Sequence, residues 1–304
     1  MTEQRRCVLI LAHTGRDATL DAAATVLELL RDGDVTPVLT EAERTDLAAL
    51  CTVDDVLVLG EDVEVEGLEL VVVLGGDGTI LRAAELVRDS DVPLLGVNMG
   101  HVGFLAEAER EDLRDTITRV VERRWDVEER HAIAVTVLQD GEIVHQDWAL
   151  NETTVEKAAR ERMLEVVLEV DGRPLSSFGC DGVVVSTPTG STAYAFSAGG
   201  PVVWPTLDAM LVVPLSAHAL FARPLVVPPT SVVAIEVLRR TPATGVLWSD
   251  GRRMKELAVG ARVEIAASPR PVRLARLHSD TDRFTDRLVR KFDLPVGGWR
   301  GPTS

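Results

Sequence analysis

The stretch from Leu68 to Glu85 decides the fold of the first half of the chain. It reads Leu-Glu-Leu-Val-Val-Val-Leu-Gly-Gly-Asp-Gly-Thr-Ile-Leu-Arg-Ala-Ala-Glu. The apolar run at its start, broken only by Glu69, is typical of a strand that is buried on both faces of a parallel sheet. Apolar residues at helical spacing follow from Ile80, with Thr79 as the expected N-cap. The stretch therefore predicts a buried strand, a glycine-rich turn and a helix.

The turn Gly75-Gly76-Asp77-Gly78 places one carboxylate among three residues that lack a side chain. Phosphates can come close to such a turn, and the N-terminus of the following helix offers unpaired N–H groups to an anion. An acid beside an anion site suits phosphoryl transfer, in which Asp77 would orient or deprotonate an attacking hydroxyl. The alternative is a turn whose glycines serve only backbone geometry.

Two common phosphate-binding motifs are excluded. The chain contains no Gly-x4-Gly-Lys-Ser/Thr motif, and Leu81 stands where the dinucleotide fingerprint needs its third glycine. Any nucleotide bound at this turn must be held by other means.

Composition limits the function classes. The chain has 304 residues and a net charge of −16, which argues against nucleic acid or an anionic membrane as a partner. Anionic substrates would then need a divalent cation, expected to be Mg²⁺, and local arginines.

The expected compartment is the cytoplasm. The three cysteines are an odd number without metal-like spacing, and are typical of free thiols in a reducing compartment. We find no signal-peptide pattern and no apolar run near the roughly 20 residues of a membrane span.

Strands and helices alternate over residues 1–125, which predicts a doubly wound, Rossmann-like α/β domain. The last helix of this domain is expected from Glu109 to Trp125. Ligands bind at the carboxyl ends of the strands in such sheets. The loops after residues 11, 74 and 97 should therefore gather His13, Asp77 and the segment from Asn98 to Gly103.

Residues 126–278 have a different pattern and predict an all-β, β-sandwich-like domain. Short strands recur, and Asp-Gly pairs at Asp140, Asp171 and Asp250 are typical of hairpin turns. Val272 to Leu277 is expected to be the last of these strands. The tail, residues 279–304, returns to helical spacing from Phe284 to Phe292 and is expected to pack back on the first domain.

A hydroxyl-rich loop from Ser186 to Tyr194 follows one of these strands. Its hydroxyls and backbone amides suit ribose and phosphate, and the tyrosine ring can stack on a base. The alternative is a polar turn. The pair Asn151-Glu152 and the residue Asp181 are each open to a binding role or to a surface or Asp-Gly turn.

Taken together, these motifs resemble the NAD kinase family in its bacterial, actinobacterial form. Their order and spacing match through nearly the whole chain. The matching segments are Gly75 to Thr79, Gly96 to Leu105, Asn151-Glu152, Asp181 to Tyr194 and Ser197 to Pro201.

The resemblance implies an α/β domain followed by a β-sandwich-like domain, usually in a homodimer or homotetramer. It implies Mg²⁺-dependent transfer of a phosphoryl group from ATP or polyphosphate to the 2′-hydroxyl of the adenosine ribose of NAD, yielding NADP. Nucleic acid and membrane are not expected as partners.

The resemblance also implies roles for individual residues. Asp77 would be the catalytic base, Asp181 would contact the carboxamide region, and Tyr194 would lie against a base. The remaining implied contacts with NAD or phosphate are Gly78, Arg82, Asn151, Glu152, Arg162, Thr189, Thr192, Ala193 and Ser197. No residue is assigned as a metal ligand. Gly179, Cys180 and His101 depart from the common pattern, which leaves open the contacts that tune NAD against NADH.

Two other functions share part of this pattern. Gly-Gly-Asp-Gly-Thr also occurs in kinases for diacylglycerol and sphingoid bases, but the loop from Thr187 to Tyr194 and the missing membrane-binding face count against a lipid kinase. A non-catalytic dinucleotide sensor would keep the pocket, although the intact Asp77 argues for an enzyme.

Overall fold

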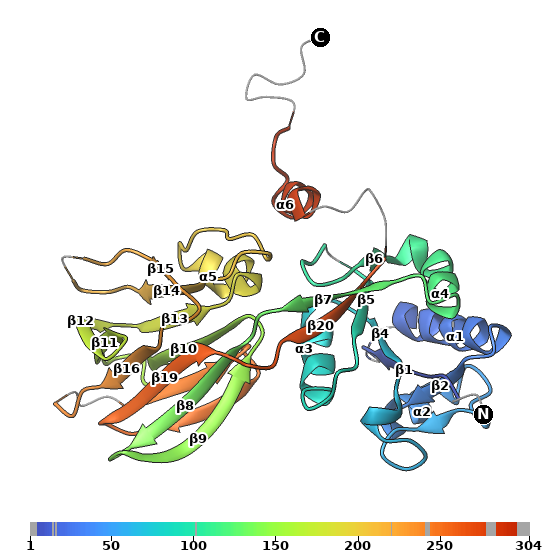
Figure 1. Ribbon diagram of the computed structural model, residues 1–304, viewed down its shortest axis with the longest axis horizontal. Coiled ribbons are helices and arrows are strands. Elements are labelled where there is room, and N and C mark those ends of the chain that lie inside the picture. Colours follow the sequence, from blue (N-terminus) through green and yellow to red (C-terminus); the bar gives the residue numbers. More distant parts are fainter. Residues whose placement is uncertain are drawn as a thin grey trace, which may run out of the picture. The chain divides into compact units, whose positions relative to one another are not determined.

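The computed structural model describes residues 5–13, 15, 17–100, 102–219, 221–240, 244–277 and 284–296. The chain divides into two compact units, of which the first comprises Met1–Glu129 with Arg273–Ser304 and the second comprises Arg130–Val272. Figure 1 labels the elements of both units, and each unit is described by itself.

The first unit is built on an eight-stranded sheet with the order β3-β2-β1-β4-β5-β20-β7, in which β6 pairs with β5. Strand β1 is parallel to β2 and β4, and β5 is parallel to β4 and β20. The strands are β1 (Cys7–Ala12), β2 (Thr36–Leu39), β3 (Leu57–Val58), β4 (Leu70–Leu74), β5 (Leu94–Asn98), β6 (Ala108–Glu109), β7 (Asp126–Arg130) and β20 (Val272–Arg276).

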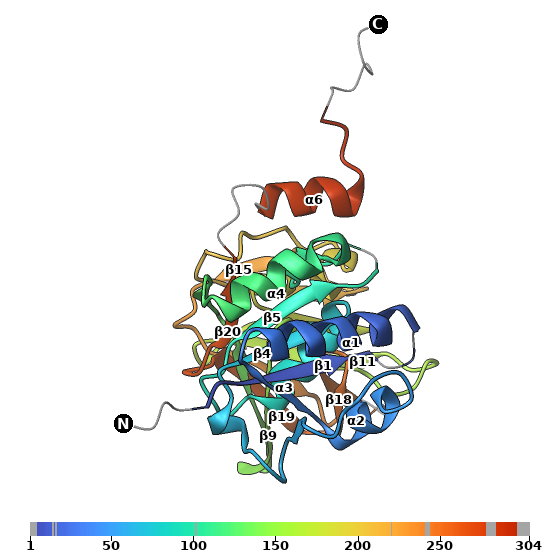
Figure 2. The same cartoon turned by 90° about the vertical axis from the view of Figure 1, so that its right-hand side faces the viewer.

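Helices cover both faces of this sheet, as Figures 1 and 2 show. Val8 and Ile10 of β1 share one core with α1 and α4. On the other face Gly96 of β5 lies so close to α3 that a Cβ there would be 2.5 Å from Ile80. The helices are α1 (Asp17–Asp32), α2 (Glu41–Leu47), α3 (Asp77–Leu86), α4 (Leu113–Val121) and α6 (Phe284–Phe292), with short 3-10 turns η1 (Val65–Gly67) and η2 (Arg110–Asp112). The predicted doubly wound α/β fold is confirmed.

Helix boundaries differ from the sequence-based expectation at two places. Helix α3 begins at Asp77 with Gly76 as its N-cap, so the prediction that Thr79 caps it was wrong. The glycine can take the extended N-cap conformation while Asp77 already occupies the first helical position. The helix expected from Glu109 to Trp125 is shorter, because η2 precedes it and Arg123, with φ of 56°, follows its end.

The second unit contains two six-stranded antiparallel sheets, with the orders β15-β14-β13-β10-β17-β18 and β12-β11-β16-β19-β8-β9. Valine, leucine and isoleucine side chains from both sheets form one core, as in a β-sandwich. The predicted all-β fold is therefore confirmed. The strands are β8 (Ile133–Gln139), β9 (Glu142–Ala149), β10 (Glu152–Lys157), β11 (Leu164–Val170), β12 (Arg173–Cys180), β13 (Gly182–Ser186), β14 (Met210–Leu215), β15 (Leu225–Val227), β16 (Val233–Val237), β17 (Gly245–Ser249), β18 (Arg253–Leu257) and β19 (Ala261–Ala267). Two short helical elements, η3 (Thr189–Thr192) and α5 (Tyr194–Ser197), follow β13.

Three of the predicted Asp-Gly turns have the backbone conformation that the dipeptide favours. Asp140, Asp171 and Asp250 have φ between 51° and 54°, and each is followed by a glycine with positive φ. Two successive residues with positive φ are the signature of a type I′ hairpin turn.

The strand expected from Val272 to Leu277 does not join the sheets of the second unit. Strand β20 lies parallel to β5 in the first sheet, with Leu274 opposite Leu94. Ala275 and Leu277 are part of the core of the first unit. A short apolar run indicates a buried strand but not the sheet that it enters, which explains the error.

The helix predicted for the tail is present as α6, which contacts the first unit through Phe104 and Glu107. Residues 278–283 and 297–304 of the tail lie outside the described residues, as does His101. Within the described part of the chain, no helix is both long enough and apolar enough to cross a membrane.

Candidate active site

Asp77 lies where β4 ends and α3 begins, and a neighbouring loop holds its side chain. Its Oδ2 accepts a hydrogen bond from the backbone N–H of Phe104, and its Oδ1 accepts one from Leu105, both at 3.1 Å. A Cβ on Gly103 would lie 2.3 Å from Oδ1, so the loop after β5 approaches the carboxylate closely. The backbone N–H of His13 donates to Leu74 O at 3.1 Å, which brings the loop after β1 to the same sheet edge. The expected meeting of these loops is confirmed.

The three positions around Asp77 hold glycine for different structural reasons. A Cβ on Gly75 would lie 2.3 Å from Thr79 Oγ1, so close packing within the turn requires this glycine. At Gly76 and Gly78 a Cβ would meet no heavy atom of the described residues within 4 Å, and neither backbone has positive φ. Packing against the Thr79 side chain therefore explains Gly75, whereas no packing contact with the described residues explains Gly76 or Gly78, which favours a ligand that lies against them.

Gly78→Ala tests this interpretation. We expect unchanged or slightly raised thermal stability, because alanine in a helix is about 0.5–1 kcal/mol better than glycine and the new methyl group would meet no heavy atom of the described residues within 4 Å. If the resemblance to the NAD kinases holds, we also expect the KM for a nucleotide substrate to rise by about tenfold or more, because the methyl group would occupy ligand space. Thermal denaturation and steady-state kinetics measure the two effects.

Gly75→Ala is the matched control. It should destabilise the chain by about 1–3 kcal/mol, because Thr79 is buried and β-branched and has little freedom to move. Normal KM values in a stable Gly78→Ala variant would contradict the ligand interpretation.

Arg82 stands one turn further along α3 and pairs with a buried acid. Its Nη2 lies 3.0 Å from Oε1 of Glu43, whose side chain is 1% exposed, while the Arg82 side chain is 45% exposed. Glu43 also accepts hydrogen bonds from Thr40 and from the N–H of Ala12, at the end of β1. Sequence reasoning missed Glu43, because it lies in a charged run that resembles an exposed helix surface.

In the second unit a pocket of about 650 Å³ brings Asp181, Tyr194 and Ser197 together. Its lining residues are Glu156, Lys157, Ala158, Arg160, Asp181, Tyr194, Ser197, Ala198, Pro214, Leu215 and Ser216. Asp181 lies between β12 and β13, which belong to different sheets, so it marks a crossover and not a hairpin turn. Its carboxylate pairs with Lys157 at 2.5 Å, and this hydrogen bond holds the pKa of Asp181 below its ordinary value.

The hydroxyls of the loop from Ser186 to Tyr194 largely bond to the protein itself. Ser186 Oγ donates to Asn151 O at 3.1 Å, and Thr187 Oγ1 donates to Leu150 O at 2.6 Å. Thr192 Oγ1 donates to Thr189 O at 3.4 Å, and Thr189 Oγ1 accepts from Arg130 at 3.5 Å. These hydroxyls therefore shape the loop, and the exposed Tyr194 at its end and Ser197 at the end of α5 line the pocket.

Asn151 and Glu152 are buried at the start of β10 and lie against the same loop. A Cβ on Gly190 would be 2.1 Å from Asn151 O, so this glycine allows the loop to close on Asn151. The backbone N–H of Tyr194 donates to Glu152 Oε2 at 3.4 Å. Ala193 continues the turn, with its N–H donating to Gly190 O at 2.9 Å. The structure thus groups most of the predicted residues of this unit.

Arg162 is the exception. It lies on an exposed turn before β11 and is not among the residues that line the pocket.

Asp250 is a residue of this site that sequence reasoning did not identify. Its carboxylate accepts three backbone hydrogen bonds, from Leu150 at 2.9 Å, Asn151 at 2.7 Å and Glu152 at 3.3 Å. The Asp-Gly pattern correctly indicated a turn here. It gave no signal that the buried carboxylate orients a segment about a hundred residues away in sequence.

The Glu152 carboxyl has an unusual protonation state. Burial, followed by the nearby charge of Asp250, raises its pKa to about 8. Glu152 is therefore mainly protonated at neutral pH and can donate a hydrogen bond, which an ordinary glutamate cannot.

Glu152→Gln should change the pH dependence of stability. The folded chain keeps a proton that the unfolded chain loses between its ordinary pKa and about 8, so the free energy of unfolding falls as pH rises through this window. The slope of this contribution approaches about 1.4 kcal/mol per pH unit, and glutamine, which cannot ionise, should remove it. Urea unfolding of both proteins at about pH 6 and pH 8 measures the difference. Identical pH dependence in the two proteins would contradict the assignment.

Among the described residues, no group of three or more His, Cys, Asp or Glu side chains could hold a metal ion. Mg²⁺ bound through substrate phosphates needs only one or two protein carboxylates, so this donor set fits a cation that arrives with a nucleotide.

Comparison with known proteins gives the class and then the family. The family model described as "ATP-NAD kinase N-terminal domain" matches residues 8–125. The family model described as "ATP-NAD kinase C-terminal domain" matches residues 150–277. With the fold and the site, these matches define a phosphotransferase built from an α/β and an all-β domain. The chain belongs to the NAD kinase family.

Individual relatives agree with this assignment. The chain is 61% identical to the NAD kinase of Leifsonia xyli over 98% of both chains, and 60% identical to NAD kinase 2 of Streptomyces coelicolor over 99% of both. A solved NAD kinase from Archaeoglobus fulgidus in complex with ATP has a TM-score of 0.71 at 25% identity, covering 96% of this chain and all of the other. The yeast NADH kinase complexed with NADH, at 22% identity and a TM-score of 0.85 over 99% of this chain and 91% of its own, shares the fold. Family membership decides against the lipid kinase hypothesis.

Proposed function

We propose that this member of the NAD kinase family transfers the terminal phosphoryl group of ATP to the 2′-hydroxyl of the adenosine ribose of NAD. One observation carries the proposal: the Asp77 carboxylate is fixed by two backbone N–H groups beside two glycines whose missing side chains leave open space. A ribose hydroxyl is a weak nucleophile at neutral pH, and a positioned base suits its activation.

Asp77 would accept the proton of the attacking 2′-hydroxyl. Each of its oxygens accepts one backbone hydrogen bond and retains a further lone pair for the substrate. The N-terminus of α3 and the exposed part of Arg82 would attract the transferred phosphate. A positioned base contributes about 10² to 10⁴ in rate, and alignment and charge neutralisation supply the rest.

The pocket of the second unit would hold NAD. Tyr194 would lie against a base, Asp181 would meet the carboxamide region, and protonated Glu152 with Asn151 would hold ribose hydroxyls. Thr189, Thr192, Ala193 and Ser197 complete the proposed contacts of this unit, and Gly78 of the first unit stays a separate proposal for a contact with NAD. Arg162 does not line this pocket, and its contact with a phosphate stays a prediction from the resemblance.

Mg²⁺ would arrive with the nucleotide and neutralise charge on its phosphates. Asp77, the carboxylate in the glycine-rich turn, would be an outer-sphere partner of this ion and would keep its free lone pairs for the 2′-hydroxyl.

The acceptor hydroxyl is tested with NAD and its 2′-deoxy analogue on the adenosine side, each with ATP and Mg²⁺. We expect NADP from NAD and no phosphorylated product from the analogue. Phosphorylation of the analogue would place the acceptor elsewhere.

The donor is tested by replacing ATP with inorganic polyphosphate at equal phosphoryl concentration. We propose ATP as the main donor, with polyphosphate as a second substrate. NADP formed with polyphosphate but not with ATP would contradict the proposed preference for ATP as the donor.

We also propose a homodimer or homotetramer in the cytoplasm. Ile143 and Val144 on β9 and Leu175 on β12 expose between 49% and 59% of their surface at the two opposite edges of one sheet, and an assembly would cover one of these edges. The thiols of Cys7, Cys51 and Cys180 are free, as expected in a reducing compartment. Light scattering of the purified protein measures the mass, and a monomer would contradict the assembly.

A further inference from the structure

Helix α6 packs against the loop after β5, which holds the Asp77 side chain through Phe104 and Leu105. The ring of Phe104 lies 5.9 Å from that of Phe284 and 6.0 Å from that of Phe292, measured between centroids. Lys291 Nζ donates to Val102 O at 2.6 Å. The C-terminal helix therefore packs on Phe104, one of the two residues whose backbone N–H groups bind the proposed base.

Arg287 makes the most buried of these contacts. It is 6% exposed, and its Nη1 donates to Phe104 O at 3.0 Å while its Nη2 donates to Glu107 Oε2 at 3.1 Å. The backbone of Phe104 is thus fixed on both sides, because its N–H donates to Asp77 and its carbonyl accepts from Arg287.

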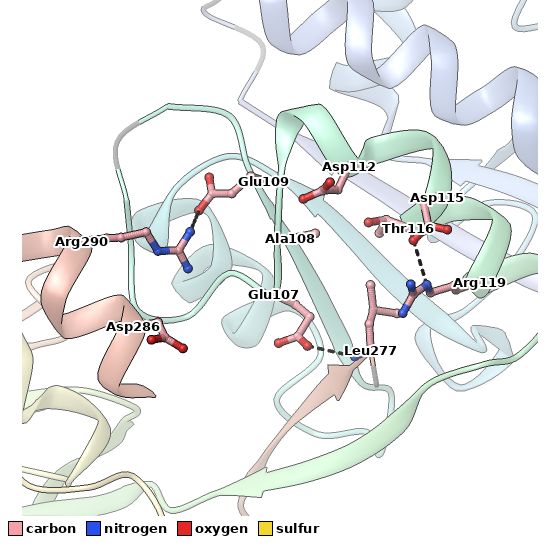
Figure 3. Close-up of a pocket in the computed structure, with 10 residues that line it drawn as sticks. All are labelled: Glu107, Ala108, Glu109, Asp112, Asp115, Thr116, Arg119, Leu277, Asp286 and Arg290. Atoms are coloured by element: carbon pink, nitrogen blue, oxygen red, sulfur yellow. Dashed lines mark hydrogen bonds and ion pairs between the residues drawn. The ribbon is translucent and has the colours of Figure 1, made fainter. Parts of the chain in front are cut away.

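Glu107 anchors this arginine to the sheet. Its Oε2 accepts from Arg276 Nη1 at 2.7 Å, and its Oε1 accepts from the backbone N–H of Leu277 at 2.9 Å, the latter drawn in Figure 3. The backbone N–H of Glu107 bonds Gly96 O of β5 at 2.8 Å. A buried guanidinium is costly unless it is paired, and here the pair connects the helix, the loop and two strands.

Arg290, one turn further along α6, is placed differently. Its Nη1 lies 3.7 Å from Glu109 Oε1, and it lines a separate pocket of about 330 Å³ between α4 and α6 (Figure 3). It has the same charge as Arg287 and lies on the same helix, but it pairs with Glu109 and lines this separate pocket, so it serves as a matched control.

We propose that Arg287 is a positioning residue for phosphoryl transfer. It fixes the Phe104 carbonyl, so that the N–H groups of Phe104 and Leu105 hold the Asp77 carboxylate in its productive orientation. This inference rests on the proposed function, because it needs Asp77 to act as the base.

The test compares Arg287→Met with Arg290→Met in NADP formation. Arg287→Met should lower kcat by roughly 10- to 100-fold with the KM for NAD changed less than about threefold, since a displacement of the base near 1 Å can cost that much. Arg290→Met should have near-normal kcat. Arg287→Lys, which keeps the charge and one donor, should restore part of the rate. This variant also tests the role of Arg287 if the methionine variant folds poorly.

A double-mutant cycle separates positioning from general destabilisation. In an Asp77→Asn background, Arg287→Met should lower the remaining kcat by less than about twofold, because the base through which it acts is already gone. Amide hydrogen exchange at Phe104 and Leu105 should be faster in Arg287→Met and unchanged in Arg290→Met.

The contrary outcomes are distinguishable. Equal losses in both backgrounds, or a normal kcat in Arg287→Met, would overturn the positioning role while the proposed function stands. Absence of NADP formation by the unmodified protein would overturn the proposed function and the positioning role with it, and the exchange rates would then report only whether Arg287 orders the loop.

Discussion

Asp77→Asn is expected to lower the kcat of NADP formation by roughly 10² to 10⁴-fold and to leave NAD binding within about threefold of the unmodified protein. Asparagine has nearly the same shape but cannot take up the proton of the 2′-hydroxyl. The change removes an interaction of the transition state, whereas the proposed NAD contacts of the second unit are untouched. Steady-state kinetics and calorimetric titration with NAD measure the two quantities.

A control must show whether Asp77→Asn also disturbs the loop after β5, whose backbone N–H groups bind Asp77. Asparagine keeps one acceptor for the N–H groups of Phe104 and Leu105 and places its own NH₂ group against the other. Amide exchange at these two residues will show how much of the loss comes from the loop. An equal loss of NAD binding and of rate would give Asp77 a binding role in place of a catalytic one.

Asp250→Ala is the second substitution with a large expected effect. It removes the acceptor of three buried backbone N–H groups, each of which costs about 1–3 kcal/mol when left without a partner. It also places alanine at φ of 51°, which adds about 1 kcal/mol of strain. We expect a loss of at least about 3 kcal/mol in the free energy of unfolding and a weakened affinity for NAD, since Asn151 and Glu152 lose their support. Urea denaturation and NAD titration measure both.

Asp250→Asn is the matched control. Asparagine tolerates positive φ and keeps one acceptor, so its loss of stability should be roughly half that of the alanine variant. Both variants should also lower the pKa of Glu152 towards its ordinary value, because the charge of Asp250 helps to raise it. Stability equal to that of the unmodified protein in both variants would contradict the role of this carboxylate.

The fold could be predicted wherever a local pattern was strong. The apolar run before Gly75 gave β4, and the Asp-Gly pairs at Asp140 and Asp171 gave hairpin turns with positive φ. The strand from Val272 was placed in the wrong sheet, because its partner Leu94 lies far away in sequence. Local sequence patterns do not indicate which distant strands pair with each other.

The same limit applies to the site. Asp77 was identified because three adjacent glycines frame it, and Asp181 and Tyr194 share the pocket of the second unit. Glu43 and Asp250 were missed, because their roles depend on backbone groups brought close only by folding. Charged residues of this kind look like surface residues until their burial is known.

The most direct test is the formation of NADP by the purified protein from NAD, ATP and Mg²⁺, detected with a dehydrogenase that accepts only NADP. We expect steady NADP production that stops when the divalent cation is chelated and falls to a trace in Asp77→Asn. Measurable NAD binding with no NADP under these conditions would contradict it and would favour a dinucleotide sensor.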